Sequence, residues 1–166
     1  VIHINKDEFV FCVGDISGKG VAAALVMANL QAYLNATLGL NYTKEKFIEN
    51  LNRKVFSITE GATFITLFIA KYNIITRELE YINAGHVPPV LVHNNRAELL
   101  NKGTTILGIF EELPKVEFGS ITIKPDTTIV SFTDGLSEME DEDGSQFGQK
   151  RLTEFALLHY HLSPET

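Results

Sequence analysis

Apolar residues recur along two early stretches of the chain with the spacing of α-helices. Residues 21–38 are strong helix formers, and their apolar side chains lie at three- and four-residue intervals, which is typical of a helix that buries one face. Residues 43–56 show the same spacing, and Thr43 is a residue type that caps helix N-termini. Residues 149–161 are also expected to be helical. Helices are therefore predicted on both sides of the central part of the chain.

Short runs rich in β-branched and aromatic residues predict strands before and between these helices. The predicted strands cover residues 9–13, 63–71, 78–83, 90–93, 121–124 and 128–132. Their connections contain turn residues such as Asn94-Asn95 or are too short for a crossover helix, so antiparallel pairing is expected. Helices before and after a run of strands predict an α+β fold of the sandwich type.

Composition limits the class of protein. A chain of 166 residues with 45% hydrophobic residues is expected to form one domain over residues 1–166. No run approaches the roughly 18 to 20 apolar residues of a transmembrane helix, and residues 1–5 do not resemble a signal peptide. A net charge of −7 without a basic stripe argues against nucleic-acid binding. The single cysteine, Cys12, excludes an intrachain disulfide and fits the cytoplasm.

The first candidate for chemistry is the loop of residues 14–20, which joins a predicted strand to a predicted helix through three glycines. A P-loop is disfavoured, because it requires four residues between its first glycine and its Gly-Lys pair, and Ser or Thr after that pair. Here only three residues lie between Gly14 and the Gly-Lys pair, and Gly20 follows Lys19. Asp15 at a strand end, before a turn that exposes backbone carbonyls, instead suits a hard cation. The alternative is a turn in which Asp15 caps the helix.

The second candidate is the stretch of residues 128–136, where a predicted strand again ends in an aspartate, Asp134, followed by Gly135. Two carboxylates a few ångströms apart repel each other by about 4 kcal/mol at an effective dielectric near 20, unless a cation lies between them. A divalent metal between Asp15 and Asp134 would remove this conflict. The alternative is an ordinary Asp-Gly turn.

The third candidate is the stretch of residues 81–89, where a strand breaks at Gly85 and two prolines fix an extended exit. His86 has the chemistry of a metal ligand or a general acid. Because no second histidine lies at ligand spacing, a hydrogen-bonded structural histidine is favoured. The acidic run of residues 138–143 lacks the ligand spacing of an EF-hand and is predicted to be a solvated loop.

Taken in order, these stretches resemble the phosphatase domain of the stage II sporulation protein E type, a bacterial branch of the PPM (protein phosphatase type 2C) family. Residues 14–20 resemble its Gly-Asp-x-Ser-Gly-Lys-Gly loop, and residues 83–89 resemble its Asn-Ala-Gly-His-x-Pro-Pro turn. Residues 133–136 resemble its Thr-Asp-Gly-Leu, and Phe147-Gly148 resembles the Phe-Gly before its late helix. The resemblance covers nearly the whole chain.

The resemblance implies a four-layer αββα fold, in which helices flank two antiparallel sheets, and two Mn²⁺ or Mg²⁺ ions at one edge of the sandwich. By similarity, Asp15 would bridge the ions, the carbonyl of Ile16 would add a ligand, and Asp134 would hold one ion. The implied reaction is hydrolysis of phosphoserine or phosphothreonine by a metal-activated water, with Asp15 and Asp134 as the catalytic residues. The motif residues expected to support the loop and turns are Gly14, Ser17, Gly18, Lys19, Gly20, Asn83, Gly85, His86, Thr133 and Gly135.

The chain also departs from the family pattern. The family carries further metal-binding aspartates before and after the positions that this sequence spans, so the domain is expected to lack the first and last strands and to bind metal weakly. Ser17 stands where eukaryotic relatives carry a histidine. The implied substrate is an anti-sigma-factor antagonist, and the implied regulator is an upstream sensor domain. The alternative function is a catalytically impaired interaction module with the same fold.

Overall fold

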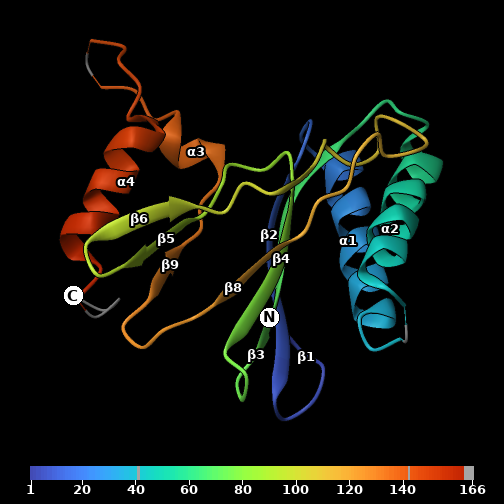
Figure 1. The fold of residues 1–166 in the computed structure, drawn as a ribbon. Coiled ribbons are helices and arrows are strands. Elements are labelled where there is room, and N and C mark those ends of the chain that lie inside the picture. The colour runs from blue at the N-terminus through green and yellow to red at the C-terminus, as the bar shows by residue number, and fades with distance from the viewer. Residues whose placement is uncertain (41, 142, 163–166) are drawn as a thin grey trace.

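Two β-sheets lie face to face in the computed structural model, which describes residues 1–40, 42–141 and 143–162 (Figure 1). The larger sheet contains β1 (Ile2–His3), β2 (Glu8–Ile16), β3 (Ile65–Asn73), β4 (Glu78–Ala84), β7 (Gly103–Thr104) and β8 (Gly119–Thr122). The smaller sheet has the order β6 (Arg96–Leu99), β5 (Val90–His93), β9 (Thr128–Val130).

Helices cover the outer face of each sheet. α1 (Val21–Thr37) and α2 (Lys44–Thr59) pack on the larger sheet, whereas α4 (Gly148–His159) packs on the smaller one beside the short α3 (Asp134–Ser137) (Figure 1). Among the described residues, no helix is long and apolar enough to cross a membrane. The layers therefore run helix, sheet, sheet, helix, as the family resemblance implied.

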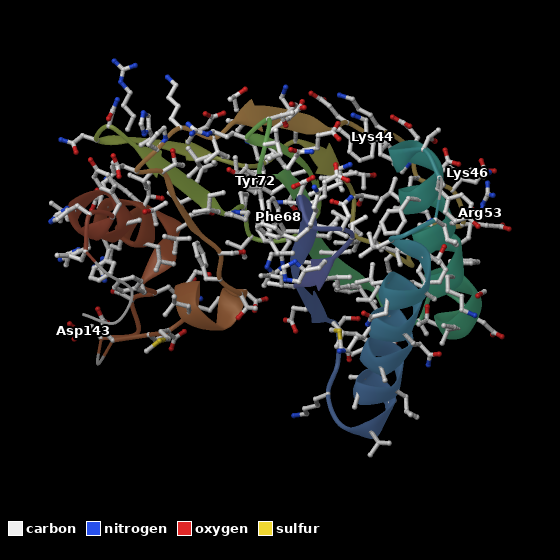
Figure 2. All side chains as sticks on the ribbon, turned by 90° about the horizontal axis from the view of Figure 1, so that it is seen from below. Lys44, Lys46, Arg53, Phe68, Tyr72 and Asp143 are labelled. Atoms are coloured by element: carbon white, nitrogen blue, oxygen red, sulfur yellow. The ribbon has the colours of Figure 1, made fainter. Side chains whose placement is uncertain are left out.

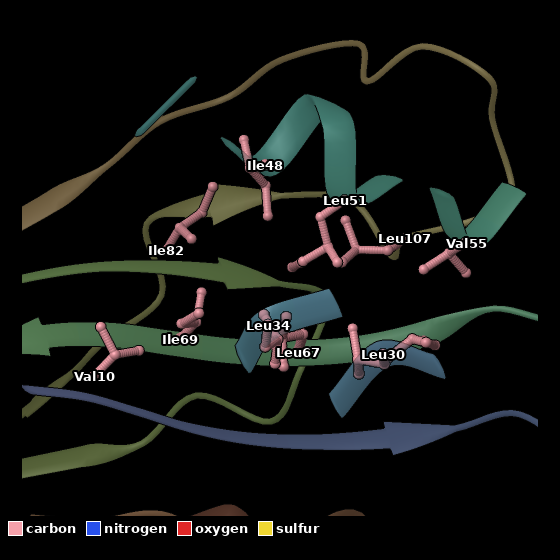
Figure 3. Close-up of a cluster of buried hydrophobic side chains, with 12 residues drawn as sticks. Val10, Leu30, Leu34, Ile48, Leu51, Val55, Leu67, Ile69, Ile82 and Leu107 are labelled. Atoms are coloured by element: carbon pink, nitrogen blue, oxygen red, sulfur yellow. The ribbon is translucent and has the colours of Figure 1, made fainter. Parts of the chain in front are cut away.

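Three groups of buried side chains separate the four layers. The first joins α1 and α2 to the larger sheet through residues such as Leu34, Leu51 and Ile69 (Figure 3). The second lies between the sheets around Phe68, and the third lies under α4 around Val92. Figure 2 shows Phe68 in the middle of the molecule and Lys46 and Arg53 on the outer side of α2, whereas Lys44 at the start of α2 contacts Glu80 of β4.

Strand β3 is a nearly continuous apolar run because it is buried on both faces. Its alternate residues Leu67 and Ile69 face the helices, while Phe68 and Ala70 face the other sheet. A strand buried on both faces loses the apolar–polar alternation that marks a half-exposed strand. β3 therefore forms the centre of the larger sheet, with β2 and β4 antiparallel on either side.

The helices and strands predicted from the sequence are present, with shifted ends. The expected cap of α2 is confirmed, since Thr43 Oγ1 accepts a hydrogen bond of 3.3 Å from the backbone N–H of Lys46. Strand β2 continues beyond the predicted end at residue 13 and includes Asp15. Strands β1, β6 and β7 and helix α3 were not predicted, and β7 pairs parallel to β4, which is an exception to the expected antiparallel order.

Candidate active site

The order of strands brings three chain segments to one edge of the larger sheet. Because β2 and β4 both run antiparallel to β3, the end of β2, the start of β3 and the end of β4 meet there. Asp15 pairs with Thr66 in the ladder between β2 and β3. The candidate loop of residues 14–20 and the candidate turn of residues 83–89 therefore lie at the same edge, although they are far apart in the sequence.

The second carboxylate reaches this edge from the smaller sheet. After β4, the turn crosses to β5, and the first residue of β5, Val90, pairs with Val130 at the end of β9. The segment after β9 leads to Asp134, the first residue of α3. The pairing of β5 with β9 thus places the segment that carries Asp134 beside the turn that carries His86.

His86 is fixed inside this turn, with only 5% of its surface exposed. Its backbone N–H donates to Asn83 Oδ1 at 2.7 Å, and Asn83 Nδ2 donates to the His86 carbonyl at 3.0 Å. Its ring Nδ1 lies 2.9 Å from Thr66 Oγ1. The prediction of a hydrogen-bonded structural histidine agrees with these contacts, and Asn83 holds the turn as a supporting residue.

The pKa of His86 is lowered from the usual value for histidine. Burial lowers the pKa, while the nearby backbone carbonyl of Phe132 and the charges of Asp15 and Asp134 act to raise it. Nε2 nevertheless makes no hydrogen bond of standard geometry within the described part of the chain. Asp15 lies at the end of β2, and Asp134 follows β9, whose partner β5 continues from the turn that carries His86.

The two carboxylates differ in exposure and have no cationic partner among the described residues. Asp15 is half-buried, and its Oδ1 accepts a hydrogen bond of 2.9 Å from the N–H of Ile16. Asp134 is exposed. Carboxylate and carbonyl oxygens are the donors that Mn²⁺ and Mg²⁺ prefer, so the residues present fit these ions.

The described residues supply only part of a metal site. In residues 1–40, 42–141 and 143–162, no three His, Cys, Asp or Glu side chains come close enough together to hold a metal ion. Asp15, Asp134 and the carbonyl of Ile16 are the donors that the sequence predicted. Two carboxylates leave most positions around a six-coordinate ion to water or to other groups.

The loop after Asp15 is shaped by Ser17 and by glycine. Ser17 and Phe64 exchange two hydrogen bonds of 2.9 Å, from the Ser17 N–H to the Phe64 carbonyl and from the Phe64 N–H to Ser17 Oγ. Gly18 and Gly20 have φ of 98° and 82°, in the left-handed region that favours glycine. Ser17 therefore ties the loop to the start of β3, and its hydroxyl is engaged in that bond.

The remaining predicted positions differ in how tightly they are held. A side chain at Gly14 would lie 2.9 Å from the carbonyl oxygen of Thr66, so glycine permits close packing there. Lys19 is exposed. Thr133 stands at the N-cap of α3 without a side-chain capping bond, and a Cβ added at Gly135 in α3 would make only ordinary contact with Thr133 Oγ1 at 3.7 Å.

Two residues near the site were missed by sequence reasoning. Thr66 contacts the His86 ring, and Gln149 Nε2 donates to the carbonyl of Pro88 at 3.0 Å, which ties α4 to the turn. Thr66 looks like any β-branched strand residue, and Gln149 looks like any helix surface residue. No local pattern distinguishes them, because their roles depend on contacts between distant segments.

Comparison with known sequences identifies relatives along nearly the whole chain. The sequence profile of the family described as Stage II sporulation protein E (SpoIIE) matches residues 5–166. Phosphoserine phosphatase RsbU of Bacillus subtilis (strain 168) is 31% identical over 143 residues, which cover 84% of this chain and 42% of RsbU. Phosphoserine phosphatase RsbP of the same organism is 23% identical and is covered to 35%. The chain thus spans less than half the length of these relatives.

Solved structures share the fold. The RsbU and RsbW domains of Rv1364c from Mycobacterium tuberculosis superpose with a TM-score of 0.76 at 26% identity, covering 93% of this chain and 44% of that one. The PP2C phosphatase domain of SpoIIE from Bacillus subtilis gives 0.71 at 17% identity, covering 86% and 42%. RsbX in complex with magnesium gives 0.65 at 20% identity, covering 96% and 77%. The expected sandwich with flanking helices is confirmed.

Proposed function

Because the chain belongs to the stage II sporulation protein E family, we propose that it hydrolyses phosphoserine or phosphothreonine in a partner protein with the help of Mn²⁺ or Mg²⁺. The observation that carries the proposal is that the strand end of Asp15 and the segment of Asp134 both lead to the buried turn of His86, and that neither carboxylate forms an ion pair in the described residues. Uncompensated carboxylates at a sheet edge are a favourable environment for a divalent cation.

Each residue of the site has a proposed task. Asp15, Asp134 and the carbonyl of Ile16 would hold the metal, with two ions expected in an intact domain. When bound, such ions supply positive charge for the phosphoryl oxygens and lower the pKa of a water molecule that attacks phosphorus. Lys19 is an exposed cation in the same loop and is proposed to attract the phosphate of the substrate.

The loop and turn residues are proposed to hold the two aspartates in place. Gly14 allows close approach of β2 to β3, and Gly18 and Gly20 let the chain turn from β2 into α1. Ser17 and Asn83 fix the two segments by hydrogen bonds. Thr133 and Gly135 flank Asp134 at the start of α3. Phosphoryl transfer demands mostly positioning and charge neutralisation from a protein, and these residues supply the positioning.

The proposed setting follows from the relatives. RsbU and RsbP are named phosphoserine phosphatases, which supports a phosphorylated protein as substrate. We propose an anti-sigma-factor antagonist as that protein, and an upstream sensor domain as the regulator. Residues 1–166 would form a single phosphatase domain that works in the cytoplasm.

Substitution of either aspartate tests the reaction. In the full-length protein, Asp15→Asn and Asp134→Asn should each reduce Mn²⁺-dependent hydrolysis of a phosphoserine peptide by about 100-fold or more, since a carboxylate charge is lost while the shape is kept. Asp126→Asn is the matched control, because Asp126 lies in the exposed turn before β9 with φ of 59°, which asparagine tolerates. Full activity in both site variants would remove the mechanism.

A non-catalytic interaction module is the second candidate. The observation in its favour is that the described residues contain no group of three metal-ligating side chains. Such a module would bind its phosphorylated partner without releasing phosphate, and Asp15→Asn would leave that binding unchanged. Measuring phosphate release and partner binding on the same full-length preparation separates the two functions.

A further inference from the structure

Thr66 stands directly opposite Asp15 and belongs to none of the motifs. In the ladder between β2 and β3, Thr66 is the partner of Asp15, and its Oγ1 lies 3.5 Å from the Asp15 carbonyl oxygen. The same Oγ1 lies 2.9 Å from Nδ1 of His86. Either tautomer of a neutral imidazole ring makes this bond, since a hydroxyl group both donates and accepts. Thr66 thus joins the strand end that carries Asp15 to the turn that carries His86.

His86 extends the connection to the smaller sheet. The next residue, Val87, packs in the same buried cluster as Phe132, two residues before Asp134. The turn that holds His86 continues directly into β5, which pairs with β9. At its far end the turn is held by Gln149 of α4, which donates to the Pro88 carbonyl at 3.0 Å. His86 is therefore buried where the larger sheet, the smaller sheet and the segment before Asp134 meet.

The hydrogen bonds of Asn83 serve a different purpose. They close the turn on itself through His86 and reach Leu100, but they do not involve the strand that carries Asp15. The contact between Thr66 and His86 instead crosses from the middle of the larger sheet to the turn. One proposed metal-binding carboxylate, Asp15, is on the larger sheet, and the other, Asp134, is in α3 after the last strand of the smaller sheet.

We propose that Thr66 and His86 are positioning residues, whose hydrogen bond fixes the Asp15 strand end against the Asp134 segment and thereby sets the separation of the two carboxylates. This inference rests on the proposed function, because the hydrogen bond can affect metal affinity only if Asp15 and Asp134 bind a metal. A metal site held within a few tenths of an ångström depends on the groups that orient its ligands, and neither Thr66 nor His86 needs to touch the metal for this role.

The test compares Mn²⁺ affinity among threonine variants of the full-length protein, using the electron paramagnetic resonance signal of free Mn²⁺. Thr66→Val keeps the shape and removes the hydroxyl, so it should weaken Mn²⁺ binding by about tenfold. Thr66→Ser keeps the hydroxyl and should stay within about twofold of the wild type. All titrations are made well below the unfolding temperature of each variant, because losing a hydrogen bond to a buried ring also lowers stability.

Thr104→Val is the matched control. Thr104 lies on β7 beside the end of β4, and its buried hydroxyl makes no hydrogen bond within the described part of the chain. Its loss should leave Mn²⁺ affinity within about twofold of the wild type. Equal affinity in wild type and Thr66→Val would overturn the positioning role. If wild-type phosphatase activity is intact in that case, the proposed function stands without the inference.

A metal-free measurement keeps the inference testable if the wild type binds no Mn²⁺, a result that would count against the proposed function instead. Amide hydrogen exchange of residues 132–135 should be faster in Thr66→Val than in wild type, whereas Thr66→Ser and Thr104→Val should exchange like wild type. Unchanged exchange in Thr66→Val would overturn the link between the sheets, because the segment before Asp134 would then be held without Thr66.

Discussion

Two glycines beside the candidate site have different structural requirements. Gly85 has φ of 66°, and a side chain there would overlap Ile106 Cγ2 and lie 3.1 Å from the Ile106 backbone nitrogen. Gly135 does not have a positive φ, and the nearest atom to an added Cβ is Thr133 Oγ1 at 3.7 Å. Both glycines belong to the sequence motifs, but the backbone conformation and the close neighbours require glycine only at Gly85.

Alanine substitution should separate the two positions. Gly85→Ala should lower the free energy of unfolding by about 1 to 3 kcal/mol, because it adds backbone strain and a clash. Gly135→Ala should change it by no more than about 0.5 kcal/mol, because alanine is a better helix former than glycine. Urea unfolding of both variants measures the difference, and equal losses would contradict the structure.

For the site as a whole, the sequence motifs likewise do not show which residues the structure requires. Asp15 and Asp134 could be singled out because each lies at or just after a strand end and before a turn, whereas their shared role in a metal site stays a prediction. Thr66 could not be predicted, since its hydroxyl acts through a contact with His86 that exists only after β3 and the turn have packed. Local sequence marks the ends of strands, but it does not mark which side chains meet there.

Among the elements, α2 shows how a polar residue can be needed on a buried face. The spacing of Ile48, Leu51 and Val55 predicted the face correctly. Asn52 is also on the buried side, with 1% of its surface exposed. Its Nδ2 donates to the carbonyls of Phe110 and Glu111, and its Oδ1 accepts from the N–H of Gly108 at 2.9 Å. Asn52 thereby fixes the loop before β8 to the helix.

Removing this amide should destabilise the domain. Asn52→Ala leaves backbone groups of the loop without partners, so the free energy of unfolding should fall by about 2 to 4 kcal/mol. Asn50→Ala on the same helix is the control, since Asn50 is half-buried and makes no side-chain hydrogen bond among the described residues. Its effect should stay within about 0.5 kcal/mol. Because alanine is a better helix former than asparagine, a similar loss in both variants would contradict a specific role of the loop contact.

Elements that depend on neighbours were the ones missed. Strand β6 carries charged and exposed residues and forms as the second half of a hairpin across Asn94-Asn95, whose φ angles are 48° and 57°. Strand β7 has two residues and exists because Asn83 and Ala84 offer a pairing edge. Neither run has an apolar pattern of its own. The long helices and the buried strands do, so the sequence predicted them.

At the scale of the whole molecule, a metal bound by both sheets should stabilise the fold. A ligand that binds only the folded state adds about 2.7 kcal/mol at a concentration of 100 times its Kd, which corresponds to a rise in unfolding temperature of several degrees for a domain of this size. Thermal unfolding of the full-length protein should therefore shift upward with Mn²⁺ and return with a chelator. Asp15→Asn should abolish the shift, and a shift that survives in this variant would place the ion elsewhere.

Because Asp15 and Asp134 belong to different halves of the molecule, the proposed metal site depends on the packing of the two halves against each other. Asp15 belongs to the half under α1 and α2, and Asp134 belongs to the half with α4. If the smaller half separates briefly while both halves stay folded, Asp15 and Asp134 each keep their local structure but no longer lie near each other. In that state the proposed metal site would be incomplete although both halves are folded, and any contact that holds the halves together would control metal binding.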